Sequence, residues 1–138
     1  MSSSLVVDAS AILTLCFEDE DNACGQRVLD AAEAGASIIV PSLWPLEVGN
    51  GLIVAERRGR LKPDAIPRFL SLLKDLAITL DQRDFTYTME TTVPLARQHG
   101  LTVYDTAYLE LALREVIPLA TADKRLANAC RAAGGTLV

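Results

Sequence analysis

The sequence is poor in residues on which several common enzyme classes depend. It has one histidine and three cysteines without a Cys-x-x-Cys spacing, and aromatic residues make up 5% of its 138 positions. His99 has no accompanying serine or cysteine pattern, so a histidine-based catalytic triad is not expected. Cys16, Cys24 and Cys130 are odd in number and fall in segments with a helical pattern. We therefore expect reduced, structural thiols.

Long hydrophobic runs and an excess of positive charge are also missing. No run approaches the roughly 18 to 20 apolar residues that span a bilayer. The start "MSSS", followed by the short apolar stretch Leu5–Val7, lacks the regions of a secretory signal. We therefore expect no membrane segment and a cytoplasmic protein. The 18 acidic and 13 basic residues give a formal net charge of −5, which argues against a surface built for nonspecific nucleic-acid binding.

Short apolar segments rich in β-branched residues alternate with helical ones along the chain. Continuous apolar runs are typical of strands covered on both faces, and parallel pairing needs crossovers such as the intervening helices. The pattern predicts an α/β sandwich formed by one domain over residues 1–138. The expected strands are Leu5–Val7, Ser37–Val40, Ala77–Leu80 and Pro118–Thr121, with a fifth candidate at Thr136–Val138.

Helical segments connect these strands. Pro45 and Pro63 suit first helical turns, whereas Pro94 removes a backbone donor and is expected to bend or divide its helix. The acidic run Glu18–Asp21 lies between two expected helices and is interpreted as a solvated cap outside any site. The expected helices are Ala9–Phe17, Asn22–Ala34, Pro45–Arg58, Pro63–Asp75, Asp84–His99, Val103–Glu115 and Asp123–Ala133.

Four carboxylates stand where strands end or helices begin. Asp8 follows the first expected strand, at the sheet edge where open α/β folds bind ligands. Each acid also has a structural alternative, because Asp8, Asp105 and Asp123 could simply cap helices and Glu47 could simply complement a helix dipole. We name the set the acidic quartet: Asp8, Glu47, Asp105 and Asp123.

A parallel sheet would bring these acids together at the carboxyl ends of neighbouring strands. Two like charges about 4 Å apart repel by roughly 4 kcal/mol at an effective dielectric near 20, so such a cluster favours protonation or a bound cation. Mg²⁺ and Mn²⁺ prefer oxygen ligands and are typically shared between carboxylates and substrate phosphates. The quartet therefore predicts metal-assisted cleavage of a phosphodiester.

Three segments carry a family resemblance in the right order over nearly the whole chain. "VVDASAIL", "PSLWPLEVGNGL" and "VYDTAYLELALREVIPLATADKRL" resemble successive motifs of the PIN-domain family, particularly the VapC-like toxin ribonucleases of toxin-antitoxin pairs. The resemblance implies a three-layer α/β/α sandwich whose central parallel sheet has the order 3-2-1-4-5. One small departure is Thr106, where similar proteins often carry alanine.

The resemblance also assigns roles to residues. It implies that the acidic quartet binds Mg²⁺ or Mn²⁺, with Asp8 and Asp105 as the first candidates for direct ligands. Ser10 and Thr121 resemble hydroxyl positions beside the first and last acids. Asn50 resembles a residue that braces its helix, although an ordinary helix-packing hydrogen bond is an equal alternative.

Substrate and partners follow from the same resemblance. It implies an endoribonuclease that leaves 5′-phosphate and 3′-hydroxyl ends, a cognate VapB-like antitoxin and a homodimer. Helices near Trp44 and Phe69 are expected to form the antitoxin groove, although the core could take most of that apolar surface. The candidate phosphate contacts lie in a basic connector, for which a solvated loop is the alternative: Arg57, Arg58, Arg60 and Lys62.

Two other functions compete with the nuclease. A catalytically silent PIN-like module that binds RNA or a partner would keep the fold, but the intact carboxylates at four positions argue against it. A receiver or haloacid-dehalogenase-like phosphoryl-transfer domain also places Asp after its first strand. The sequence lacks the DxDxT string and the suitably placed lysine of those folds.

Overall fold

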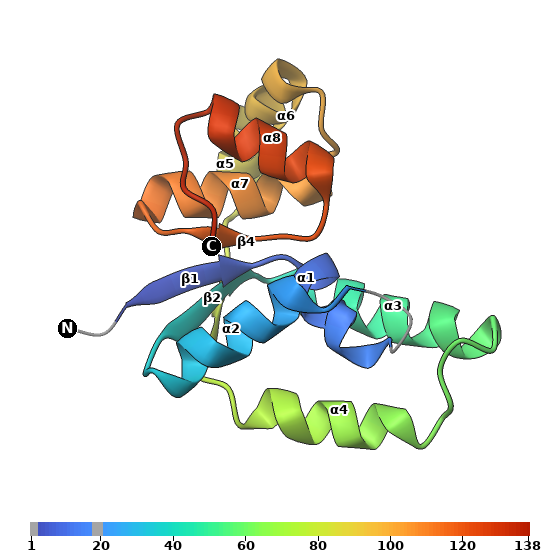
Figure 1. Cartoon of the computed structure of the whole chain (residues 1–138). Helices are drawn as coiled ribbons and strands as arrows, with labels where there is room; N and C mark the ends of the chain where they lie inside the picture. The colour runs from blue at the N-terminus through green and yellow to red at the C-terminus, as the bar shows by residue number, and fades with distance from the viewer. Residues whose placement is uncertain (1–2, 18–20) are drawn as a thin grey trace.

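The computed structural model describes residues 3–17 and 21–138, so most of the acidic run Glu18–Asp21 lies outside the described residues. Its sheet has four parallel strands in the order β3-β2-β1-β4. Helices cover both faces (Figure 1), which confirms the α/β/α sandwich. The strands are β1 (Ser4–Val7), β2 (Ser37–Pro41), β3 (Ile78–Asp81) and β4 (Leu119–Ala120).

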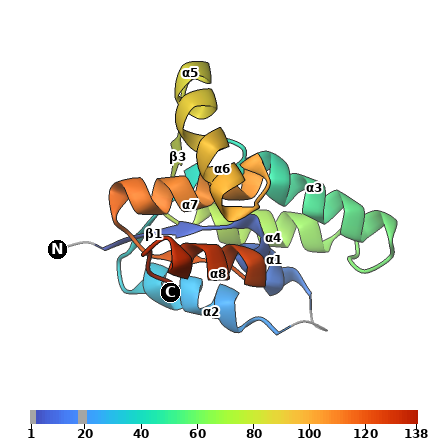
Figure 2. The ribbon, with the colours of Figure 1, turned by 90° about the horizontal axis from the view of Figure 1, so that it is seen from above.

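Two groups of helices form the outer layers. In Figure 1, α1, α2 and α4 lie below the sheet, whereas α6, α7 and α8 lie above it. Figure 2 shows α7 crossing the sheet with α6 and α8 on its two sides. The helices are α1 (Ala9–Leu13), α2 (Ala23–Glu33), α3 (Trp44–Arg57), α4 (Ala65–Lys74), α5 (Phe85–Tyr87), α6 (Val93–His99), α7 (Val103–Glu115) and α8 (Lys124–Ala132).

The inner strands carry the core of the sheet. Val6 and Val7 of β1 are fully buried, as are Val40 of β2 and Leu119 of β4, so their continuous apolar runs are covered on both faces as predicted. The edge strand β3 differs, because its Leu80 is half exposed. No helix among residues 3–17 and 21–138 is long and apolar enough to cross a membrane.

The fifth expected strand is reduced to a single bridge. Leu137 pairs in parallel with Leu119, and Leu119 exchanges backbone bonds with Thr136 and Val138. The segment lies beside β4, as the predicted order requires. The prediction of a full strand was wrong because β4 itself has only two residues, which leaves a neighbour little ladder to extend.

Two expected helices are interrupted. The first ends at Leu13 and continues as a 3-10 turn over Thr14–Cys16, where the Thr14 hydroxyl donates to the Ala11 carbonyl. The segment from Asp84 is divided before Pro94 by a π-helical stretch, Thr88–Thr92. A wider π turn accommodates the donor that proline lacks, because it displaces the local hydrogen-bond ladder.

Close helix packing fixes the elements that begin at the sheet edge. A Cβ added at Gly25 of α2 would lie 2.9 Å from the Ala11 carbonyl oxygen of α1, so glycine lets these helices approach closely. The thiols of Cys16, Cys24 and Cys130 are free, as predicted. The close contact with α2 at Gly25 fixes the position of α1, whose first residue follows Asp8 directly.

Candidate acidic active site

Asp8 is a buried carboxylate at the carboxyl end of the central strand. It is 5% exposed, and its Oδ2 accepts hydrogen bonds from Ser10 Oγ at 2.7 Å and Thr121 Oγ1 at 2.6 Å. Each hydroxyl in turn accepts a backbone N–H, from Ala122 and Asp123 respectively. That arrangement leaves both hydroxyl protons for Asp8. The two predicted hydroxyl positions therefore orient this carboxylate.

The second oxygen of Asp8 is almost unused. Among the described residues, Oδ1 accepts one hydrogen bond, from the Ser10 N–H at 3.3 Å, which is the helix-capping bond considered from the sequence. Capping therefore occupies one face of the carboxylate and leaves acceptor capacity on Oδ1. Burial raises the pKa of Asp8, the hydroxyl bonds counteract this, and the charge of Asp123 raises it further.

Glu47 lies in the first turn of α3 and faces α7. Its Oε1 accepts a hydrogen bond of 2.5 Å from the Tyr108 hydroxyl, and Tyr108 is fully buried. Burial raises the pKa of Glu47, as do the charges of Asp8 and Asp105, whereas the Tyr108 bond lowers it. Glu47 therefore does more than complement the dipole of α3, because it also accepts a hydrogen bond from Tyr108.

Asp105 is not the cap of its helix. Thr102 caps α7, with its hydroxyl accepting the Asp105 N–H at 3.1 Å. The Thr106 hydroxyl donates to the Thr102 carbonyl. The threonine that stands here in place of the alanine of similar proteins is therefore accommodated in the first turn of α7. Burial raises the pKa of Asp105, as do the charges of Asp8 and Asp123, whereas a hydrogen bond to Thr102 and the charge of Arg125 lower it.

Asp123 combines capping with a place in the quartet. Its Oδ1 accepts the N–H groups of Arg125 and Leu126, at 2.8 and 3.4 Å, which caps α8. Its own N–H donates to Thr121, the residue that also bonds Asp8. Asp123 therefore caps α8, as the structural alternative proposed, and this capping uses one of its two carboxylate oxygens.

The quartet is crowded, and the charge of Arg125 offsets the repulsion at Asp105 only in part, since the pKa of Asp105 is raised overall. Its members act electrostatically on one another, and within residues 3–17 and 21–138 none forms an ion pair. Yet no three His, Cys, Asp or Glu side chains described here stand in a group that could hold a metal ion. Mg²⁺ usually takes one or two carboxylates, several waters and substrate phosphates. The donor chemistry fits that shared mode and not a closed protein cage.

Asn50 does not brace the site in this structure. It is exposed on α3 and makes no hydrogen bond within the described ranges, so neither bracing nor helix packing is seen. It lines a cavity of about 260 Å³ with Leu13, Phe17 and Arg58. A role for Asn50 in the acidic site stays a prediction without a contact to support it.

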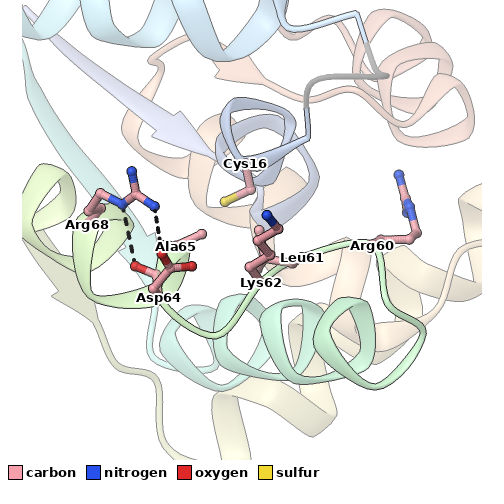
Figure 3. A pocket seen from close by; sticks show the side chains of 7 residues that line it. All are labelled: Cys16, Arg60, Leu61, Lys62, Asp64, Ala65 and Arg68. Carbon is pink, nitrogen blue, oxygen red and sulfur yellow. Dashed lines mark hydrogen bonds and ion pairs between the residues drawn. The ribbon is translucent and has the colours of Figure 1, made fainter.

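The basic connector lies at the far end of α3. Arg57 is ten positions after Glu47, about 15 Å along a helix axis. Arg60 and Lys62 line a cavity of about 500 Å³ beside Cys16, shown in Figure 3, where Arg68 pairs with Asp64. Arg60 also lies over the Phe17 ring, 4.4 Å from its centroid. Any RNA contact by the connector would fall away from the acids.

Tyr108 is the residue that sequence reasoning missed. It stands three positions after Asp105, so both side chains lie on neighbouring parts of one helix face. The available signal was a tyrosine within the mostly apolar stretch "AYLELAL" of the expected helix. Its partner Glu47 is 61 positions away, which no local pattern indicates.

We expect Tyr108→Phe to weaken the binding of Mg²⁺ by the acidic quartet. Losing the bond to Glu47 should raise the Mg²⁺ concentration for half-maximal RNA cleavage about 10-fold, as is typical for groups that orient metal ligands. Tyr87→Phe is the matched control, because Tyr87 also donates to a glutamate, Glu110, outside the quartet. Equal Mg²⁺ requirements in the two variants would contradict the orienting role.

Comparison with known proteins identifies the family and the fold of the chain. The PIN domain family model matches residues 5–132. The chain is 34% identical to Ribonuclease VapC3 of Pyrobaculum aerophilum over 124 residues, which is 90% of this chain and 92% of the relative.

Two solved structures share the fold. PAE2754 from Pyrobaculum aerophilum superposes with a TM-score of 0.69 at 26% identity, covering 94% of this chain and 87% of that one. VapC20 of Mycobacterium tuberculosis, a Sarcin-Ricin loop cleaving toxin, gives a TM-score of 0.65 at 14% identity, covering 97% and 98%. With a family model that matches nearly its whole length, the chain belongs to the PIN domain family.

Proposed function

We propose that this protein is a metal-dependent endoribonuclease and the toxin of a toxin-antitoxin pair. The observation that carries the proposal is Asp8, a buried carboxylate with a largely free oxygen and no ion pair among the described residues. Its charge interacts with those of Glu47, Asp105 and Asp123. The similarity to Ribonuclease VapC3 supports RNA as the substrate.

The residues suited to hold Mg²⁺ or Mn²⁺ are Asp8 and Asp105, assisted by Glu47 and Asp123. A bound divalent cation would supply Lewis-acid stabilisation of phosphate charge and lower the pKa of a water. The chain supplies the orientation. Ser10 and Thr121 fix Asp8, while Tyr108 fixes Glu47. Fixed carboxylates need little reorganisation when a charged substrate arrives.

The proposed antitoxin has a suitable apolar groove. A cavity of about 330 Å³ between α3 and α4 is lined mainly by apolar side chains, among them Trp44, Val48, Phe69 and Leu73. The Trp44 indole N–H is buried and has no partner in the described part of the chain. A helical peptide in the groove would cover this surface, and a second copy of the chain is the competing occupant implied by the proposed homodimer.

The direct test incubates purified protein with end-labelled RNA, in Mg²⁺ or Mn²⁺ and then in excess chelator. We expect cleavage only with metal, and products with 5′-phosphate ends. Millimolar metal should also raise Tm in the absence of RNA, because it binds the native state alone and relieves the quartet. At 100 times Kd the gain is about 2.7 kcal/mol.

Each of three other results would point to a different function. Cleavage that persists in chelator would overturn the metal dependence. Uncut but bound RNA, across varied sequences and both metals, would favour the silent RNA-binding module. Absence of both cleavage and binding, with a stable complex at the α3–α4 groove, would favour a partner-binding module.

A further inference from the structure

A second cavity lies at the same edge of the sheet as the acidic site, because its lining includes Pro41 and Asp81, the last residues of the parallel strands β2 and β3. It measures about 250 Å³ and is bounded by the start of α3, the end of β3, the π-helical segment and α7. Leu43 in its wall accepts the backbone N–H of Glu47. Tyr104, also in the wall, directly precedes Asp105, and consecutive Cα atoms are only 3.8 Å apart. A substrate held at the acids would therefore have its neighbouring groups beside this cavity.

Tyr104 offers an aromatic face at the cavity. Its side chain is 66% exposed, although aromatic residues are few in this protein and the other tyrosines, Tyr87 and Tyr108, are less exposed and hydrogen-bonded. Exposed aromatic side chains beside a nucleic-acid path are stacking platforms for bases.

The opposite wall contains a threonine hydroxyl. Thr92 lines the cavity and is 4% exposed, and its side chain makes no hydrogen bond within the described residues. Its Oγ1 is not among the fully enclosed polar atoms that lack a partner, so a ligand in the cavity can reach it. A π turn of this kind is frequent at functional sites.

The charges of the lining are compensated. Asp81 is paired with Arg83 at 2.8 Å and with Arg114 at 2.7 Å. Glu110 is paired with Arg114 at 2.8 Å. No lining carboxylate is left without a cation, so the cavity does not repel RNA as the metal-free quartet would. It suits a neutral, planar ligand with hydrogen-bonding edges.

We propose that this cavity, between Tyr104 and Thr92, binds a nucleobase of the RNA that flanks the cut bond. Tyr104 stacks on the base, and the Thr92 hydroxyl bonds to its edge, as donor or acceptor. The inference rests on the proposed ribonuclease function for its substrate. It assigns base preference at one position to two residues that lie outside the quartet.

The first test compares cleavage of a random single-stranded RNA pool, with cut sites mapped by sequencing the new ends. We expect Tyr104→Ala to raise KM about 5- to 20-fold, in the range of one lost base stack, with a smaller change in kcat. Thr92→Val keeps the side-chain shape and should flatten the base preference at one position. Tyr104→Phe keeps the ring and should restore KM.

Phe85→Ala is the matched control, since Phe85 is 80% exposed but does not line this cavity. It should leave KM and base preference unchanged. An RNA with an abasic nucleotide at the preferred position should lose as much affinity as Tyr104→Ala, and the combination should lose no more. Unchanged KM in Tyr104→Ala together with unchanged preference in Thr92→Val overturns the proposal.

A binding assay separates this proposal from the nuclease assignment. Fluorescence anisotropy of a labelled RNA 12-mer, measured in the Asp8→Asn background, needs no cleavage. If the wild type cuts no RNA, the nuclease function fails, yet weaker binding by Tyr104→Ala than by Phe85→Ala still supports the base pocket. Equal binding by both overturns the pocket, whether or not the wild type cleaves.

Discussion

Asp8→Asn is expected to abolish RNA cleavage while making the metal-free protein more stable. Asparagine keeps the shape, and an amide oxygen in the place of Oδ2 still accepts from Ser10 and Thr121. Its NH2 group then replaces the oxygen that caps α1, and a buried charge is removed. Loss of a metal ligand forfeits several kcal/mol of transition-state stabilisation, about a thousandfold or more in rate. We expect a gain of about 1 kcal/mol in stability, or roughly 2–4 °C in Tm.

The sign of the stability change depends on pH. Burial raises the pKa of Asp8, so the folded state binds a proton more readily than the unfolded chain. The ionised form therefore weakens the fold above the folded-state pKa, and this cost disappears as pH falls through it. The Tm advantage of the variant should be largest at neutral pH and should shrink in acid.

Asp75→Asn is the matched control for Asp8→Asn, because Asp75 is exposed at the end of α4. It should change neither cleavage nor Tm appreciably. Millimolar Mg²⁺ should narrow or reverse the Tm difference between the wild type and Asp8→Asn. Full cleavage by Asp8→Asn would refute the assignment of Asp8.

Arg114→Ala is expected to cause the largest loss of stability. Arg114 bonds Glu110 of its own helix and Asp81 at the end of β3, and its side chain is 20% exposed. Truncation removes the cation paired with the poorly exposed Glu110 and leaves Asp81 with its pair to Arg83. Breaking a buried pair costs about 3–5 kcal/mol. Because the Arg114 side chain is partly exposed, we expect a loss at the lower end, about 3 kcal/mol, or roughly 6–12 °C in Tm.

Arg68→Ala provides the comparison, because Arg68 and Asp64 form a pair whose side chains are 75% and 72% exposed. Exposed pairs contribute about 0 to 1 kcal/mol, so that variant should melt close to the wild type. Chemical denaturation of both proteins measures the difference. A similar small loss in both variants would show that the Arg114 network contributes little to stability.

The cost of Arg114→Ala should also depend on pH. Burial raises the pKa of Asp81, but bonds to Arg83 and Arg114 outweigh it and hold that pKa below its usual value. A depressed folded-state pKa gives stability that is present above the unfolded pKa of about 3.9 and is lost as pH falls through the folded value. The two proteins should therefore converge in strong acid.

Local sequence patterns were sufficient for the four strands of the sheet and for selecting the quartet as candidates, whose metal role stays a prediction. Apolar runs such as Leu5–Val7 identify buried strands because parallel strands are covered on both faces. The sheet edge then follows, since the residues after those runs must meet at one side. Asp8, Glu47 and Asp123 were found this way, and for each the structure also shows the contacts that compete with a metal role.

Long-range contacts were beyond such patterns. The bonds from Tyr108 to Glu47 and from Arg114 to Asp81 join residues 61 and 33 positions apart, and the choice of partner is set by packing. The bracing role of Asn50 stays a prediction, because a local pattern does not say which side chain would meet an exposed position of α3.

The central place of β1 has a consequence during synthesis. One neighbour, β2, is made soon after it, but the other, β4, follows only after the whole of α7. Asp105 and Asp123 arrive equally late, and parallel pairing over such separations is slow. A nascent chain on the ribosome therefore carries Asp8 and Glu47 before Asp105 and Asp123 have been made.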